Sequence, residues 1–348
     1  MQKRKSSTLS LIAIIILYGF LVYPFFNCSA QVTGKRTLLA ISKADHMLCL
    51  VDPVTLNIKS RIPVGIDPHE VVASSDGKIA YVCIYGNGSF HEINVIDLIA
   101  QKSIKNIDTK PLFGPHDITF VNGKAWFTAE GSKSIGRYDP INGTIDWSMG
   151  TGQDRTHMLY VSPDNKRIYT TNVSSGTVTI LVDTLIQAGK NAPPNTSARM
   201  EWLETVIPTD KGSEGFDVSP DGKELWTASS ESGIISIIDL ESKKLSAKID
   251  AKVLSANRLK FTPDGNQVFI SSLHSGELTI YNSKTQKQIK NIKIGKGAAG
   301  ILMDPIYSRA FVACSPDNYI AIIDLKTLSV IGRLNVGGTP DGLAWASQ

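Results

Sequence analysis

The sequence predicts a seven-bladed β-propeller, an all-β ring, and three observations lead to this prediction. One pattern of strand, tight turn, strand, loop and strand recurs along the chain, most clearly in residues 215–240, GFDVSPDGKELWTASSESGIISIIDL. Most copies start about 42 residues apart, a spacing that suits a unit of four strands. The two ends of the chain carry incomplete copies that complement each other.

Each copy opens with two strands joined by a tight turn. Phe216 and Val218 alternate with small or polar residues, as in a half-buried strand. The following segment, residues 219–223 (SPDGK), has the residues of a turn. Proline presets φ, aspartate bonds nearby backbone, and glycine accepts positive φ. Such a unit cannot bury both faces alone, so it needs copies of itself as neighbours.

Seven starts of the pattern can be placed, and their number predicts the number of blades. The intervals between them are 47, 41, 58, 42, 42 and 42 residues, for starts at His69, His116, His157, Gly215, Asn257, Ala299 and Asp341. Residues 37–64 read as three strands without a first one, and the last start supplies a single strand. We therefore expect the C-terminal strand to pair with the N-terminal blade, which closes the ring and leaves no open edge.

The repeats also carry a family resemblance. The element at residues 168–181 (IYTTNVSSGTVTIL), the SPDGK turns and the IIDL-type strands resemble the YVTN-repeat β-propellers. The resemblance implies an extracytoplasmic protein, related in fold to propeller lactonases and to cytochrome d1-type propellers. The best copy, Tyr169-Thr170-Thr171-Asn172, departs from the namesake motif at its second position. The Trp-Asp ending of the WD-repeat class is absent.

The N-terminal segment reads as a secretory signal peptide. Basic residues at positions 3–5 precede an apolar stretch at 9–26, and Ala30 offers a cleavage site. The prediction is therefore a leader at residues 1–30, one propeller domain at 31–348, and a periplasmic or extracellular location. Two alternatives stay open, because the apolar stretch is long enough to span a bilayer uncleaved and Cys28 is a candidate lipidation site.

Composition narrows the classes of partner. Removing three basic leader residues lowers the net charge from +4 to +1, and no basic stripe interleaved with aromatic residues remains. Charge thus gives no reason to predict a nucleic-acid surface. The odd set Cys49, Cys83 and Cys314 falls in three blades and predicts buried thiols rather than disulfides. We expect a monomer.

One insertion interrupts the period between the third and fourth strands of the fourth blade. Residues 185–200 contain Pro-Pro and a polar run, so we expect a loop there. In a propeller this connection lies on the face opposite the starts of the innermost strands. We call the face with those starts the top face and the opposite one the bottom face. The insertion is either a tolerated surface excursion or an arm that binds a partner.

Candidate chemistry lies on the top face. The first strand of three consecutive blades begins with histidine, at His69, His116 and His157. The other histidines, at positions 46, 91 and 274, fall in loops between second and third strands, which also lie on top. Equivalent positions elsewhere supply carboxylates and amides, and arginines follow nearby. The predicted ligand-binding set is His69, His116, His157, Glu214, Asn257, Asp341, Arg155 and Arg258.

Three functions from different classes fit this pattern. The first is a module that binds a small molecule or a partner in a histidine-lined pocket. The second is a metal-assisted lactone hydrolase or lyase, in which His69, His116 and His157, with Glu214, hold a divalent transition metal or act as base. Arg155 or Arg258 would orient its substrate. The family resemblance implies a relation between this chain and the propeller lactonases, but only at the level of fold. The third is a protein-interaction scaffold that uses the insertion.

Overall fold

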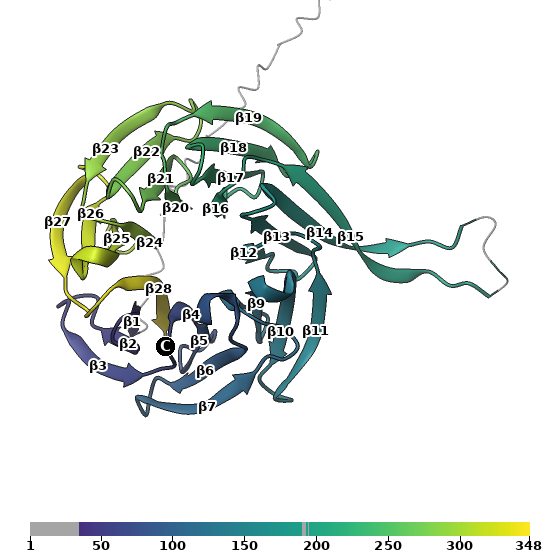
Figure 1. Ribbon diagram of the computed structural model, residues 1–348, viewed down its shortest axis with the longest axis horizontal. Coiled ribbons are helices and arrows are strands. Elements are labelled where there is room, and N and C mark those ends of the chain that lie inside the picture. The colour runs from purple at the N-terminus through teal and green to yellow at the C-terminus, as the bar shows by residue number, and fades with distance from the viewer. Residues whose placement is uncertain (1–34, 190–192, 194) are drawn as a thin grey trace, which may run out of the picture. The chain divides into compact units, whose positions relative to one another are not determined.

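The structure is a computed structural model that describes residues 35–189, 193 and 195–348. The predicted signal peptide, with its alternatives, lies outside these residues. Within them, no helix is long and apolar enough to cross a membrane. The described chain forms a ring of β-sheets (Figure 1). Residues of the innermost strands line a cavity at its centre, in what we call the channel.

Seven four-stranded antiparallel sheets make up the ring, which confirms the predicted seven-bladed propeller. The innermost strands are β4 (Pro68–Ala73), β8 (Pro115–Val121), β12 (Thr156–Val161), β16 (Ser213–Val218), β20 (Ala256–Phe261), β24 (Ala298–Asp304) and β28 (Pro340–Ser347). The second strands are β1 (Arg36–Ser42), β5 (Ile79–Ile84), β9 (Lys124–Ala129), β13 (Arg167–Asn172), β17 (Glu224–Ser229), β21 (Gln267–Ser272) and β25 (Arg309–Cys314).

The outer half of each blade completes the sheet. The third strands are β2 (Met47–Val51), β6 (Glu92–Asp97), β10 (Ser134–Asp139), β14 (Thr177–Ile186), β18 (Ile234–Asp239), β22 (Glu277–Asn282) and β26 (Tyr319–Asp324). The fourth strands are β3 (Ile58–Pro63), β7 (Lys102–Asp108), β11 (Thr144–Gly150), β15 (Arg199–Pro208), β19 (Lys244–Asp250), β23 (Gln288–Lys293) and β27 (Ser329–Leu334). Single 3₁₀ turns follow three second strands, as η1 (Gly86–Gly88), η2 (Glu130–Ser132) and η3 (Ser315–Asp317).

The ring is closed as the sequence predicts. Strand β28 pairs antiparallel with β1, from Arg36 opposite Ser347 to Ser42 opposite Pro340. The first blade therefore takes its innermost strand from the C-terminal end and its other three from the N-terminal end. This pairing gives β1 an inner neighbour, as the second strand of every other blade has.

The core lies between neighbouring blades. Trp126 and Trp226 occupy equivalent positions on second strands and are fully buried. The Trp226 ring packs edge-on against Phe261 of the next blade, with centroids 5.8 Å apart. The three described cysteines are free and buried on β2, β5 and β25. Each blade thus supplies apolar side chains that bury its neighbour's face.

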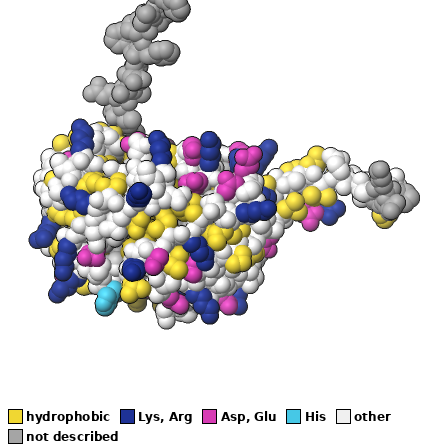
Figure 2. Space-filling model, turned by 90° about the horizontal axis from the view of Figure 1, so that it is seen from above, with side chains coloured by type: hydrophobic (Ala, Val, Ile, Leu, Met, Phe, Trp, Pro, Cys, Tyr) yellow, Lys and Arg dark blue, Asp and Glu magenta, His cyan; other side chains and the backbone are white. Residues whose placement is uncertain are grey.

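The insertion continues a strand pair. Strands β14 and β15 remain paired out to Ile186 and Arg199, so only residues 187–198 connect them. This hairpin projects outward from the perimeter (Figure 1). Apolar side chains lie along it, and Leu185 and Met200 are about half exposed (Figure 2).

The innermost strands approach so closely that three of them carry glycine at the third position. These are Gly215, Gly300 and Gly342, each against the backbone of the next innermost strand. A Cβ on Gly215 would lie 2.5 Å from the Asn257 carbonyl oxygen and 2.6 Å from Arg258 Cα. Because these are backbone atoms, no side-chain rotation relieves the overlap.

We predict that Gly215→Ala lowers the free energy of unfolding by about 1–3 kcal/mol, through overpacking at the axis. Urea denaturation measures the change. The matched control is Gly150→Ala on an outermost strand, where the nearest atom would be 4.0 Å away, and it should change stability by less than about 0.5 kcal/mol. Equal effects of the two substitutions would show that the axis is not tightly packed.

Candidate functional site

The second residue of each innermost strand lies at the top of the channel. In chain order these residues are His69, His116, His157, Glu214, Asn257, Ala299 and Asp341. The neighbouring blade fixes several of them by a hydrogen bond from a second-strand hydroxyl to their backbone carbonyl. Thr128 Oγ1 donates to His157 over 2.7 Å, and Thr171 Oγ1 donates to Glu214 over 2.6 Å.

The three innermost-strand histidines lie in contact, as the repeat spacing suggests. The ring centroids of His116 and His157 are 3.9 Å apart, and those of His69 and His116 are 4.7 Å apart. Tyr85 packs against two of the rings, 4.7 Å from His69 and 5.0 Å from His116. Packing of this kind makes one cluster from three separate blades.

His157 is held between two carboxylates. Its Nδ1 hydrogen-bonds Glu130, and its Nε2 lies 3.3 Å from Glu214 Oε1 without hydrogen-bond alignment. Burial disfavours the charged imidazole, but contact with the two carboxylates outweighs it and raises the pKa of His157 to about 9. Burial would raise the pKa values of Glu130 and Glu214, but His157 brings both below their ordinary value. The three groups form a buried charged unit.

The other two rings are in the opposite state. Burial, reinforced by the Lys43 charge, lowers the pKa of His69 to about 3. Burial and then the charge of His157 hold the pKa of His116 well below 6.5. His116 is 3% exposed, and its Nδ1 has no hydrogen-bond partner within the described chain. His116 is therefore a neutral imidazole with a free ring nitrogen.

The remaining predicted polar residues line the same end of the channel. Asn257 donates from Nδ2 to Glu214 Oε1 over 3.3 Å, and its Oδ1 lacks a partner among the residues described. Asp341 Oδ2 lies 4.0 Å from Lys43 Nζ, and burial raises the pKa of its carboxyl to about 6. These groups place acceptors beside the histidine cluster.

The two predicted arginines, Arg155 and Arg258, differ in how easily a ligand can reach them. Arg155 Nε lies 3.7 Å from Glu130 Oε2, and its side chain is 46% exposed. Arg258 is buried and donates to Glu70 and to the Asn257 carbonyl. A ligand could reach Arg155 directly, whereas Arg258 would first have to leave Glu70.

Three residues of the site were missed by the sequence reasoning. Lys43, Tyr85 and Glu130 each follow directly after a second strand, β1, β5 and β9, in consecutive blades. Tyr85 donates its hydroxyl to Glu130, and Lys43 Nζ lies 2.7 and 2.9 Å from the two ring nitrogens of His69. Their common place in the repeat is the signal that could have identified them.

The other histidines do not join the cluster. His46, His91 and His274 lie in the loops between second and third strands, as predicted. His91 Nδ1 pairs with Asp108 Oδ1 at 2.9 Å. Seen from the side, the histidine visible on the molecule lies at one edge of the ring (Figure 2). The top face therefore carries one buried cluster and separate surface histidines.

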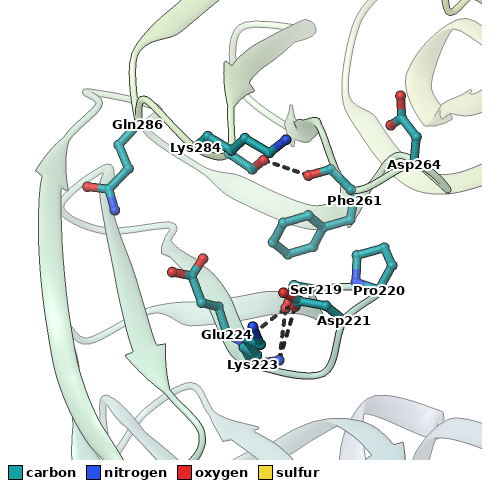
Figure 3. Close-up of a pocket in the computed structure, with 11 residues that line it drawn as sticks. Ser219, Pro220, Asp221, Lys223, Glu224, Phe261, Asp264, Lys284 and Gln286 are labelled. Carbon is teal, nitrogen blue, oxygen red and sulfur yellow. Dashed lines mark hydrogen bonds between the residues drawn. The ribbon is translucent and has the colours of Figure 1, made fainter. Parts of the chain in front are cut away.

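Two cavities can be compared with this cluster as candidate binding sites. One of about 360 Å³ lies in the channel, lined by Glu70, Asp117 and Arg258 but by none of the three histidines. Another of about 500 Å³ lies between turns of the fifth and sixth blades (Figure 3). There Ser219 and Asp221 are engaged in their own turn, in bonds such as the 2.6 Å contact between Ser219 Oγ and Asp221 Oδ1. These two polar side chains of the turn pocket are therefore already used to stabilise a turn.

The chain matches no family model and no curated protein sequence. It is similar in structure to a putative 6-phosphogluconolactonase from Bacteroides fragilis (TM-score 0.71, 13% identity, covering 90% of this chain and 99% of that one). A second such protein, from Bacteroides uniformis, has TM-score 0.69 and 15% identity, with 89% and 99% covered. Dihydro-heme d1 dehydrogenase NirN has TM-score 0.62 and 14% identity, with 86% and 64% covered. At these identities the similarity shows the propeller fold alone.

We predict that His157 makes stability fall at alkaline pH. Its pKa is near 6.5 in an unfolded chain and about 9 in the folded state. The raised folded value means that its contribution is complete below about pH 6.5 and is lost as pH rises through 9. Between pH 6 and 10, the free energy of unfolding should fall by about 3 kcal/mol more in the parent protein than in His157→Gln.

Urea denaturation at successive pH values, in buffer with EDTA, measures this difference. The control is His274→Gln, at an exposed histidine of the top face, which should follow the parent protein. Parallel curves for the parent and His157→Gln would contradict the assignment of a charged, carboxylate-bound imidazole.

Proposed function

We propose that this protein binds a small polar ligand at the top mouth of its channel, through the histidine cluster. The single observation that carries the proposal is the free Nδ1 of His116, on a ring that is 3% exposed. A buried polar atom without a partner costs free energy, and a ligand that hydrogen-bonds it recovers that cost. Asn257 Oδ1, also unpartnered in the described chain, would accept a second hydrogen bond.

We also propose a cellular location and an oligomeric state for the protein. Basic residues followed by an apolar stretch at positions 9–26 support export, with periplasmic or extracellular location and a membrane anchor as the variant if the segment is retained. The ligand would then be taken from outside the cytoplasm. We propose that the ring acts as a monomer, since it is closed within one chain by the pairing of β28 with β1.

A hydrolase acting on a cyclic ester is the second candidate. The neutral state of His116 favours it, since an uncharged imidazole can accept a proton from an attacking water. Arg155, which is half exposed beside Glu130, could hold an anionic substrate. The lactonase names of two structural neighbours belong to those proteins and support this candidate only as a choice of compounds to test.

Ligand binding is tested by thermal unfolding against sugars, sugar acids, amino acids and quaternary amines. A compound at 100 times its Kd should stabilise the protein by about 2.7 kcal/mol, and His116→Ala should abolish the effect because the free ring nitrogen is gone. His274→Ala, an exposed histidine in a loop of the same face, is the matched control. A ligand effect that survives both His116→Ala and Asn257→Ala would place binding elsewhere.

Hydrolysis is tested with a panel of sugar lactones, by following acid release with a pH indicator. We expect turnover to be lost in His116→Ala and KM for anionic lactones to rise in Arg155→Ala. No turnover above the spontaneous rate, with and without added divalent metal, would eliminate this candidate and leave ligand binding.

A further inference from the structure

We propose that His116, Glu130 and His157 form a binding site for one divalent transition-metal ion, with Zn²⁺ as the reference ion. Each residue offers one ligand atom, and these atoms lie within 4.8 Å of one another. The inference rests on the proposed function, because the ion would lie at the same mouth and anchor the small ligand there. Two imidazoles and one carboxylate are donors that such ions accept.

The three residues are positioned before any ion binds. All are at least 94% buried, and they come from β8, the first position of η2, and β12. His116 Nδ1 has no hydrogen-bond partner within the described residues. A buried cluster with a ring nitrogen left free differs from a satisfied polar core, in which every such atom is bonded.

Outer partners hold the proposed ligands in place. Tyr85 donates its hydroxyl to Glu130, and Glu214 Oε1 lies 3.3 Å from His157 Nε2. Partners of this kind orient metal ligands and tune their affinity. The carboxylates of Glu130 and Glu214 offset the charge of a dication, while Arg155, 3.7 Å from Glu130, opposes it from the exposed side.

His69, which the sequence pattern placed in the metal-binding trio, is the least suited of the histidines. Lys43 Nζ lies within 2.9 Å of both its ring nitrogens and 3.0 Å from Asp67 Oδ1. An ammonium group at that place occupies the nitrogens and repels a second cation. Glu130 therefore replaces His69 in the ligand set.

Binding requires His157 to release its proton to solvent, because only a neutral imidazole ligates a metal ion, and it also requires the side chains to shift. In a tetrahedral site, two atoms that are each about 2.1 Å from the ion are about 3.4 Å apart. A pair of ligand atoms as far apart as 4.8 Å would therefore have to close by about 1.4 Å, and the ion would take the place of the hydrogen bond between His157 and Glu130. Three protein ligands leave an open position for water or for an oxygen of the small ligand.

Zn²⁺ and Co²⁺ titrations of the full chain, purified without a metal-affinity tag and stripped with EDTA, test the proposal. Calorimetry should show one ion per chain. His116→Ala and the nearly isosteric Glu130→Gln should weaken binding on the order of 100-fold or more, and Tyr85→Phe about 10-fold. His69→Ala should retain binding within about 3-fold, and the surface variant His274→Ala is the control.

The Co²⁺ absorption spectrum and X-ray absorption of the parent protein give an answer even if a variant fails to fold. Two imidazoles with a carboxylate, and no thiolate, support the assignment. Absence of one-to-one binding overturns it, as does loss of binding in His69→Ala with retention in Glu130→Gln. If no ion binds but an organic ligand still depends on His116, the metal site fails while the proposed function stands. If the ion binds but no organic compound does, the proposed function fails while the metal site stands.

Discussion

The close approach of the seven innermost strands around the axis is the constraint on which the rest of the structure depends. A ring of this kind keeps its radius only if the last blade joins the first, and the pairing of β28 with β1 makes that joint. At Gly215 the next strand's backbone leaves no space for a Cβ. The same closeness brings the second residue of each innermost strand to a common end of the channel, so residues of separate blades become neighbours.

Burial then gives equivalent positions different chemistry. His69, His116 and His157 occupy the same place in consecutive repeats, yet only His157 lies between two carboxylates. Its imidazole is stabilised in the charged form, whereas desolvation keeps His116 neutral. A repeated residue has thus acquired distinct roles, because the residues after the second strands differ from blade to blade, as Lys43, Tyr85 and Glu130 do.

The three clustered histidines are confined to one side of the mouth. They come from the second, third and fourth blades, whereas the seventh blade presents Ala299 at the equivalent position. Seven identical blades would present seven identical sites, so differences between the blades are needed to form a single ligand site. Function in this fold belongs to the site and not to the architecture, which propellers of 13–15% identity to this chain share.

The sequence by itself determined the blade number, the closure and the top-face position of all six histidines, since each follows from the period of the repeat. Only the tertiary structure decided which side chains meet. Glu130 lies 27 residues from His157 and Tyr85 lies 45 residues from Glu130, so no local spacing links them. Arg258 was predicted from the sequence to bind a ligand, but in the structure it pairs with Glu70, 188 residues away. Periodicity specifies where each residue stands in its blade, whereas contacts across blades and the resulting desolvation set its partner and its charge.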